Sequence, residues 1–461
     1  MTVVSSARAA AYRILHRVES GRAFAVDLLQ SERVSDLPEV DRRLVTELDM
    51  GVLRWRGDLD FRIERLSGKP LRYFDPEVAT VLRLGIYQIV FLDKVPKAAV
   101  VNEAVEMVKA ARKRSAAGLV NAVLRKCEPC RGLSGPEHRR GVGPAGDSSA
   151  PSPEALESAR RSFLPWLLDR WERHFGSEAA GALAWSSVLA PRTCLRVAVG
   201  ADAREEIQRQ LAEEGIETRI GKYGQQTLVV QSGDARSSEL ARHGRIAVQD
   251  EASQLVAELV APRPGQRALD LCAAPGIKTG QLASALGSGV LVASDMSARR
   301  LRTMLKLLDR PPLPTGLQLH IVRLDAARPL PFAVKFDRVL LDAPCSGTGT
   351  LARNPEIKWR LEPRDLGRLA AIQAEMLRNA LGVLAPGGRL VYATCSLEPE
   401  ENDQVVEGAL AEKQGPRLLS RNELTREFPD LSPLFDPCGY FRTRPDLHSV
   451  DGFFAAVIEA R

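Results

Sequence analysis

The sequence of 461 residues lacks any apolar run near the roughly 20 residues that a membrane-spanning helix needs. Its first residues, MTVVSSARAAAYRILHRVES, also lack the apolar core of a secretion signal. Cysteine is scarce, and 7 residues, an odd number, do not suggest a disulfide framework in so long a chain. These absences disfavour membrane and secreted proteins, and they lead us to expect reduced thiols and a cytoplasmic location.

Histidine is equally scarce, and the 6 residues form no cluster in the sequence. The segment CEPC at 127–130 has C-x-x-C spacing, but no second pair of Cys or His residues follows at the spacing of a zinc site. His138 lies nearby and is a weak candidate by itself. We therefore expect no metal.

Positive charge is what the sequence has in excess. The formal net charge is +6, and residues 1–130 hold 22 Lys and Arg against 17 Asp and Glu, so nearly all of the surplus lies in the first third. A basic domain beside a nearly neutral one indicates a nucleic-acid partner, because Lys and Arg that face phosphates release counterions. A solvated basic surface explains the charge equally well.

The spacing of apolar residues divides the chain into four parts. Residues 1–130 carry apolar residues at three- and four-residue spacing and predict a helical bundle. Residues 131–153 contain almost no apolar residues and predict a flexible linker. Residues 154–248 begin with a helical pattern and continue with short strands around a helix, which indicates a small α/β module. Residues 249–461 alternate strands with helices, the pattern of a parallel sheet.

Five predicted strands of the last domain end in an acid or a cysteine. Because ligands of open α/β sheets bind outside the carboxyl ends of the strands, these residues are expected to gather at one edge. A single acid there has a second explanation, as the N-cap of the following helix, but the series is a stronger signal. The residues are Cys272 after RALDL, Asp295 after GVLVAS, Asp325 after LQLHIVRL, Asp342 after DRVLL and Cys395 after GRLVYAT.

The first of these turns, DLCAAPGIKTGQL at 270–282, has the residues expected of a site for a cofactor that carries no phosphate group. Its glycines do not form the G-x-G-x-x-G pattern of dinucleotide enzymes, although a tight turn into a helix still allows backbone amides to approach a carboxylate. Asp295 is spaced to accept from the two ribose hydroxyls, and Asp325 is placed to accept from an adenine amino group. A ribose, an adenine and a carboxylate describe S-adenosylmethionine. The expected contacts are Cys272, Ala273, Ala274, Pro275, Gly276, Ile277, Lys278, Asp295, Asp325 and Asp342.

Four motifs in this order, DLCAAPGIKT, LDAPCSGTG, RNPEIKW and YATCSLEPEEND, resemble those of the cytosine-5 RNA methyltransferase family. Three N-terminal stretches, GVLRWRGDLD, VLRLGIYQIVFLDKVPKAAVVNEAVEMVK and GLVNAVLRK, resemble the helical domain of the antitermination factor NusB. The two together resemble bacterial methyltransferases of 16S ribosomal RNA, over nearly the whole chain outside 131–153. The resemblance implies a NusB-like helical bundle, a small α/β module and a Rossmann-like class I methyltransferase domain that uses S-adenosylmethionine.

The sequence departs from the family in one turn. The family's usual Gly-Gly-Lys-Thr is Gly276-Ile277-Lys278-Thr279 in this chain. Glycine adopts backbone conformations that a branched residue avoids, so Ile277 is expected to alter the backbone of the turn.

The resemblance assigns roles to the two cysteines. In the family the cysteine of Thr-Cys-Ser attacks carbon 6 of cytosine, so Cys395 is the expected nucleophile. The cysteine of Asp-Ala-Pro-Cys assists elimination, so Cys345 is expected to act in product release, and Asp342 is expected to hydrogen-bond the cytosine. Because an ordinary thiol is only a few per cent thiolate at neutral pH, Lys278 and a helix that begins after Ser396 are expected to favour the thiolate.

The expected reaction is therefore methylation of carbon 5 of a specific cytosine in 16S ribosomal RNA, by a monomer whose partner is RNA. Transfer RNA is the alternative substrate, because only the N-terminal domain argues for ribosomal RNA. An inactive RNA-binding scaffold is disfavoured by the complete set of cysteines and acids, and DNA methylation by the presence of Thr-Cys-Ser. Lys358 and Trp359 of RNPEIKW either contact the target nucleotide or belong to an ordinary packed loop.

Overall fold

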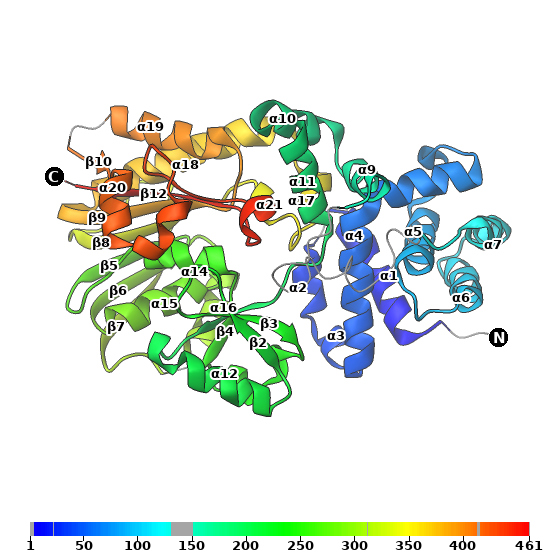
Figure 1. Cartoon of the computed structure of the whole chain (residues 1–461), viewed down its shortest axis with the longest axis horizontal. Coiled ribbons are helices and arrows are strands. Elements are labelled where there is room, and N and C mark those ends of the chain that lie inside the picture. The colour runs from blue at the N-terminus through cyan, green and yellow to red at the C-terminus, as the bar shows by residue number, and fades with distance from the viewer. Residues whose placement is uncertain (1–3, 22, 131–150, 311, 413–414, 461) are drawn as a thin grey trace. The chain divides into compact units, whose positions relative to one another are not determined.

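The computed structural model describes residues 4–21, 23–130, 151–310, 312–412 and 415–460. The chain forms two compact units (Figure 1): a helical unit, Met1–Pro191 with Thr350–Leu361, and a sheet unit, Arg192–Gly349 with Glu362–Arg461. The linker expected at 131–153 lies outside the described residues except for its last three, and His138 lies outside them too. No helix in the described ranges is long and apolar enough to cross a lipid bilayer.

The helical unit is built around α4 and α5, which bury long apolar faces in one core. α4 ends at Gly68, whose φ of +68° suits a glycine, and α5 begins with Pro76 at its first position. The stretch AFAVDLLQSERV forms two short helices, α2 and α3, rather than a single one. The helices are α1 (Ser6–Glu19), α2 (Ala25–Leu29), α3 (Glu32–Ser35), α4 (Glu39–Ser67), α5 (Pro76–Phe91), α6 (Lys97–Ala110) and α7 (Ala117–Lys126).

Three more helices belong to the helical unit. α9 lies close to α4, where a Cβ on Gly57 would be 2.0 Å from the carbonyl oxygen of Arg161. Nearby, the fully buried carboxylate of Asp58 accepts hydrogen bonds from Arg62 at 2.6 Å and Arg161 at 3.1 Å. Residues 154–191 of the module expected at 154–248 therefore belong to this unit, whereas the strands and the later helices of that module belong to the sheet unit. The three helices are α9 (Pro153–Arg161), α10 (Pro165–Phe175) and α11 (Ser177–Val188).

The strands of that module form a four-stranded antiparallel sheet of order β2-β3-β1-β4. Ile207 and Leu211 of α12 pack against Leu195 and Leu228 of the sheet and form a small core. The elements are β1 (Cys194–Val197), α12 (Arg204–Glu213), β2 (Glu217–Ile220), β3 (Thr227–Ser232), α13 (Glu239–Arg242) and β4 (Ile246–Val248).

The large sheet has the strand order β10-β12-β9-β8-β5-β6-β7, with β11 paired to β12. Strands β5 to β9 are parallel, and the chain adds β6 and β7 on one side of β5 but β8 and β9 on the other. Ligands of such sheets bind outside the carboxyl ends of the strands, near a reversal of this kind. The strands are β5 (Arg267–Leu271), β6 (Ser288–Asp295), β7 (Gly316–Arg323), β8 (Phe336–Asp342), β9 (Leu384–Thr394), β10 (Arg417–Leu418), β11 (Phe441–Thr443) and β12 (Phe453–Glu459).

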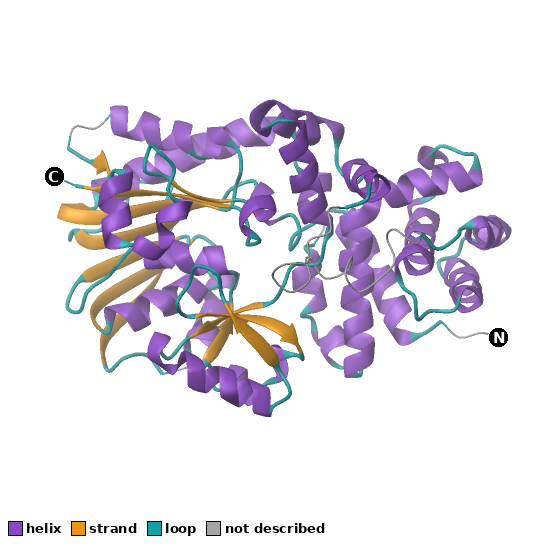
Figure 2. Cartoon of the chain, viewed as in Figure 1, coloured by secondary structure: helices purple, strands orange, loops and turns teal. Residues whose placement is uncertain are grey.

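Helices cover both faces of this sheet (Figure 2). Leu340 and Val391 pack with α14 and α15 on one face, and Leu341 and Tyr392 pack with α18 and α19 on the other. Because neighbouring residues of a strand point to opposite faces, burial on both sides explains the unbroken apolar runs of β8 and β9. The predicted α/β fold class is confirmed. The helices are α14 (Glu251–Glu258), α15 (Ile277–Leu286), α16 (Ala298–Leu308), α18 (Pro363–Gly382), α19 (Asp403–Ala411), α20 (Arg421–Glu427) and α21 (Pro445–His448).

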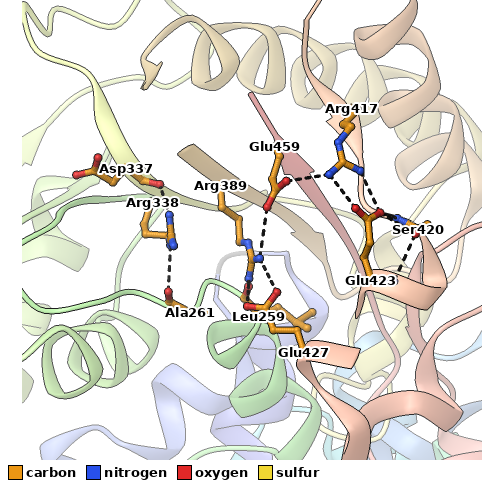
Figure 3. Close-up of polar contacts among 10 residues, drawn as sticks. All are labelled: Leu259, Ala261, Asp337, Arg338, Arg389, Arg417, Ser420, Glu423, Glu427 and Glu459. Atoms are coloured by element: carbon orange, nitrogen blue, oxygen red, sulfur yellow. Dashed lines mark hydrogen bonds and ion pairs between the residues drawn. The ribbon is translucent and has the colours of Figure 1, made fainter. Parts of the chain in front are cut away.

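A polar network joins β9, β10, β12 and α20 away from the carboxyl ends of the parallel strands (Figure 3). The nearly buried Arg389 donates to both oxygens of Glu427, at 2.8 and 2.7 Å, and lies 3.6 Å from Glu459. Arg417 bridges Glu459 to Glu423. The hydrogen bonds from Arg389 lower the pKa of Glu427, so this carboxylate stabilises the fold in its charged form.

We expect Glu427→Gln to lower the free energy of unfolding at neutral pH by no more than about 1 kcal/mol, because solvent screens this part-exposed pair. The pKa of Glu427 is lower in the folded chain than in the unfolded one. Its contribution is therefore present above the ordinary glutamate pKa and is lost as the pH falls through the folded value. Urea unfolding followed from about pH 7 to about pH 3 should show the two proteins converging.

Glu213→Gln is the matched control, because Glu213 pairs with Arg209 on an exposed helix surface. It should change the free energy of unfolding by at most a few tenths of a kcal/mol at every pH. A difference between wild type and Glu427→Gln that grew on acidification would contradict the assignment.

Candidate active site

Two thiols meet just beyond the carboxyl ends of β8 and β9. The two strands are parallel neighbours and pair Asp342 with Ala393, so the loops that follow them begin side by side. Further along, the backbone N–H of Gly349 donates to the carbonyl oxygen of Cys395 at 2.9 Å. Within the loop closed in this way, the sulfur of Cys345 lies 3.4 Å from that of Cys395.

The carboxylate of Glu401 joins the two loops that carry the thiols. It is fully buried at the end of the short 3-10 turn Pro399–Glu401. Its Oε1 accepts from the backbone N–H of Ser346 at 2.8 Å and from Nε2 of Gln373 at 3.0 Å. Its Oε2 accepts from the hydroxyls of Ser346 and Ser396, the latter at 2.5 Å. Each serine follows one of the cysteines, so a single carboxylate fixes the position of both.

A partly buried ion pair lies in the same region of the sheet unit. Nζ of Lys278 donates to Oδ2 of Asp342 at 2.8 Å and lies 5.2 Å from the ring centroid of Phe453. Burial opposes the lysine's charge, but the Asp342 carboxylate outweighs it and raises the pKa of Lys278, and Cys395 acts in the same direction. Lys278 is therefore a charged ammonium within electrostatic reach of Cys395.

The thiol of Cys345 holds its proton more tightly than an ordinary thiol. The hydrogen bond with Cys395 and then burial raise the pKa of Cys345 well above that of an ordinary thiol. Cys345 therefore keeps its proton and can donate it in a hydrogen bond to the sulfur of Cys395. The α-helix expected after Ser396 begins at Asp403, the first residue of α19, and the 3-10 turn Pro399–Glu401 precedes it.

The turn between β5 and α15 brings its backbone to the carboxyl edge of the sheet. Gly276 has a φ of +102°, and a Cβ there would lie 2.6 Å from Cγ of Met304, so the position requires glycine. Ile277 is the first residue of α15, so its backbone is helical. Cys272, Ala273, Ala274 and Pro275 form the rest of the turn, and Cys272 has a φ of +61°.

Asp295 and Asp325 lie at the ends of β6 and β7, as expected. Asp295 is the buried last residue of β6; its Oδ1 accepts from the N–H of Ser297 at 2.8 Å, and its Oδ2 lies 3.3 Å from Arg300. Asp325 follows β7 by two residues, and its Oδ1 accepts from the N–H of Ala327 at 3.0 Å. The N-cap of α16 is Ser297, so capping does not explain Asp295.

Asp270 is a further carboxyl of this edge, which sequence analysis did not single out. Its Oδ2 accepts from Oγ1 of Thr279 at 2.6 Å, and its buried Oδ1 has no hydrogen-bond partner among the described residues. Burial raises the pKa of Asp270 to about 7, so a neutral carboxyl is accessible here near physiological pH.

The donor set fits S-adenosylmethionine. Carboxylates at the ends of β6 and β7 can accept from hydroxyl and amino groups, and the turn after β5 offers backbone rather than a glycine-rich phosphate cradle. All of these groups stand on the sheet unit, on the β5 side of the strand-order reversal.

Lys358 and Trp359 do not join the thiols. They lie on α17 (Ile357–Arg360), which belongs to the helical unit. Nζ of Lys358 donates to the carbonyl oxygen of Arg54 at 2.7 Å, and Nε1 of Trp359 donates to that of Leu53 at 3.0 Å. The structure therefore supports packing, rather than contact with a nucleotide, for both side chains.

Over the part of the chain that the structure describes, no group of three or more His, Cys, Asp or Glu residues is arranged to hold a metal ion. Cys127 of the CEPC segment is buried, and burial raises its pKa to about 11, which disfavours the thiolate that a metal ligand requires.

Comparison with known proteins finds matches for both the N-terminal and the C-terminal regions of the chain. Residues 257–459 match the family model of the 16S rRNA methyltransferase RsmB/F, and residues 5–129 match the NusB family. The chain is 32% identical over 461 residues to the probable ribosomal RNA small subunit methyltransferase B of Bacillus subtilis, with 98% of both chains covered. It is 35% identical over 416 residues to the ribosomal RNA small subunit methyltransferase B of Pseudomonas putida, with 89% of this chain and 90% of that one covered.

Two solved structures share the fold. The crystal structure of PH0851 has a TM-score of 0.76 and 23% identity, with 99% of both chains covered. The methyltransferase homologue protein from Pyrococcus horikoshii has a TM-score of 0.56 and 28% identity, with 67% of this chain and 100% of that one covered. At its level of identity, the first likeness supports the fold alone.

We expect Glu401→Ala to destabilise the protein by at least about 3 kcal/mol, because it leaves the N–H of Ser346 buried without its acceptor and removes the acceptor of the Ser346 and Ser396 hydroxyls. Glu401→Gln keeps an acceptor oxygen and should cost less. Glu407→Ala, at an exposed position of the following helix, should be nearly neutral. Urea unfolding measures all three, and equal stability of the Ala variant and wild type would contradict the role of Glu401.

Proposed function

Because the chain belongs to the ribosomal RNA small subunit methyltransferase B family, we propose that it methylates carbon 5 of a specific cytosine in 16S ribosomal RNA through a covalent cysteine–cytosine adduct. The observation that carries this proposal is the pair of thiols 3.4 Å apart at the ends of adjacent strands, beside the Lys278–Asp342 ion pair. Cys345 keeps its proton, and its neighbour Cys395 lies within electrostatic reach of Lys278. Two thiols in such different settings suit a reaction in which one attacks and the other acts in release.

Cys395 is the nucleophile. Carbon 5 of cytosine is a weak nucleophile, and the bond that the Cys395 thiolate forms to carbon 6 shifts ring electrons so that carbon 5 becomes an enamine carbon. Bound S-adenosylmethionine supplies the methyl group as an electrophile. The positive charge of Lys278 favours the thiolate before attack.

Cys345 acts in release. After methylation, the proton on carbon 5 passes to water, the ring double bond forms again, and the bond between carbon 6 and the Cys395 sulfur breaks with its electrons on sulfur. The S–H of Cys345 donates to that leaving thiolate, which the raised pKa of Cys345 makes possible at neutral pH. Cleavage of the bond between carbon 6 and sulfur restores the Cys395 thiolate for the next cycle.

Asp342 orients the base. Its carboxylate accepts from the exocyclic amine of cytosine, while Lys278 holds the carboxylate from the other side at 2.8 Å. The cofactor is held by the turn Cys272–Lys278, by Asp295 for the ribose hydroxyls and by Asp325 for the adenine amino group. Each assignment rests on a carboxylate or backbone group at the carboxyl edge of the sheet.

The helical unit supplies affinity for RNA. Residues 1–130 carry nearly all of the surplus positive charge, and they match the NusB family. Contacts between Lys or Arg and phosphates strengthen binding without a sequence preference, so the target cytosine is selected elsewhere.

RNA bisulfite sequencing tests the reaction and its substrate. In a strain that lacks this protein, one cytosine of 16S ribosomal RNA should become convertible, and wild-type protein should restore its protection. A site that appears in transfer RNA instead would replace ribosomal RNA as the substrate. Identical conversion patterns in both RNAs with and without the protein would contradict the proposal.

Substitution of the two cysteines should have different effects. Cys395→Ala should abolish methylation and adduct formation, whereas Cys345→Ala should slow release by about 10–100-fold, through loss of a hydrogen bond to the leaving thiolate, and accumulate protein bonded to RNA. A denaturing gel shows that adduct as a slow band which nuclease removes. The double variant should show no band, and Cys438→Ala, at an exposed cysteine, should turn over normally.

A band that survives without Cys395 would refute its role as nucleophile. A band that requires Cys345 instead would exchange the two roles. Normal turnover by Cys345→Ala would remove Cys345 from the release step.

A further inference from the structure

Residues 350–361, which we name the anchored segment, are the part of the chain that leaves the sheet unit and folds into the helical unit. Residues on both sides of it, up to Gly349 and from Glu362, belong to the sheet unit. The segment carries the whole RNPEIKW motif, residues 353–359, which the proposed reaction does not use.

The helical unit binds the anchored segment mainly through backbone carbonyl groups. Lys358 is fully buried, donates to the carbonyl oxygen of Arg54 at 2.7 Å, and lies 4.5 Å from the ring centroid of Phe163. Burial, followed by the charge of Arg54, lowers the pKa of Lys358. Nε1 of Trp359 donates to the carbonyl oxygen of Leu53. These contacts use the polar atoms with which both side chains would contact a nucleotide.

Further hydrogen bonds run in both directions. Arg360 donates to the carbonyl oxygens of Val18, at 2.7 Å, and Ala23. The buried carboxylate of Glu356 accepts from the backbone N–H of Ala25 at 2.9 Å. In the reverse direction, Nε of Arg54 donates to the carbonyl oxygen of Ala352 at 2.8 Å. The segment is therefore joined to α1, to α4 and to the start of α2.

The anchored segment is directly continuous with the loop that carries Cys345. Gly349, its preceding residue, donates to the carbonyl oxygen of Cys395 at 2.9 Å and accepts from the N–H of Gly452 at 2.8 Å. A Cβ on Gly349 would lie 2.1 Å from the carbonyl oxygen of Gly452, so the exit from the loop is tightly packed. Only three residues separate Cys345 from this exit.

The other end of the segment leads back to the same loop. Glu362 is the N-cap of α18, and Gln373 of that helix donates to the carbonyl oxygen of Pro344 at 2.9 Å and to Glu401. Both neighbours of the anchored segment in the chain therefore contact the Cys345 loop. Gly349 precedes the segment and ends that loop, and α18 follows the segment and donates to the loop through Gln373.

We propose that the anchored segment is a positioning element, through which the helical unit fixes the loop 343–349 and thereby the distance between Cys345 and Cys395. Lys358 and Trp359 are positioning residues that act through backbone continuity. This inference rests on the proposed function for its catalytic consequence, but the positioning itself is measurable without methylation.

Alkylation of cysteines by N-ethylmaleimide, read by mass spectrometry for each peptide, tests the positioning in the full-length chain. Trp359→Phe removes one donor, and Lys358→Met removes the other at similar side-chain length. Either change should raise the rate of Cys345 labelling by about tenfold through local opening of its loop. Labelling is kept below one adduct per chain, so that modification of one thiol does not alter its neighbour.

The protein carries its own controls. Cys127 is buried in the helical unit and Cys194 in the sheet unit, and both should stay slow, whereas the exposed Cys438 should stay fast. Lys335→Met is the matched variant, because Lys335 also donates to a backbone carbonyl, that of Gly382, at an exposed site outside the segment. It should leave Cys345 unchanged.

Unchanged labelling of Cys345 in both segment variants would overturn the proposal. An equal rise at Cys345, Cys127 and Cys194 would also overturn it, because that result reports general unfolding. If Lys358→Met does not fold, Trp359→Phe decides alone. Faster labelling of Cys345 together with an unaffected methylation rate would support the positioning and count against the proposed role of Cys345 in catalysis.

Discussion

The buried carboxylate of Glu401 is the group on which the arrangement of the two thiols depends. The parallel pairing of β8 with β9 brings their two loops to the same edge, but pairing alone leaves each loop free to turn either way. Glu401 removes that freedom, because it accepts from one loop through Ser346 and from the other through Ser396. A carboxylate that receives four hydrogen bonds in the interior is satisfied without a cation. The charge of Lys278 therefore remains directed at Asp342 and Cys395.

Sequence patterns were sufficient for the strands and for the residues at their ends. β5, β6, β8 and β9 are short apolar runs bounded by turns, and burial on both faces makes such runs easy to detect. Glu401 could not be found in this way, because EPEEND contains several acids and only the tertiary fold selects the one that faces Ser346, 55 residues earlier. The same limit applies to Lys358, whose partner Arg54 lies 304 residues away. The helices at 153–188 looked continuous with the strands that follow them, since local periodicity does not report which core an amphipathic helix joins.

The carboxyl ends of the parallel strands and the region around Arg389 carry different kinds of polar group. Acids, thiols and one lysine stand at or near the carboxyl ends of the parallel strands, where Asp270 and Cys345 both have raised pKa values. Arginines paired with glutamates occupy the region of Arg389, Glu427 and Glu459 (Figure 3). Buried groups with raised pKa values are typical of sites that carry out a reaction. Ion pairs between arginine and glutamate chiefly connect neighbouring strands and helices. This division separates the residues that carry chemistry from those that hold the sheet together.

The return of residues 350–361 to the helical unit also sets an order of events during synthesis. The ribosome makes the helices up to Val188 first, and about 160 further residues must follow before the segment that completes their hydrogen bonds exists. At ordinary rates of translation this takes roughly ten to thirty seconds. Through that interval the nascent helices lack Lys358, Trp359 and Arg360, and the region around Leu53 and Arg54 stands open to water or to a chaperone. The helical unit is therefore completed late, close to the time at which Cys345 and Cys395 leave the ribosome.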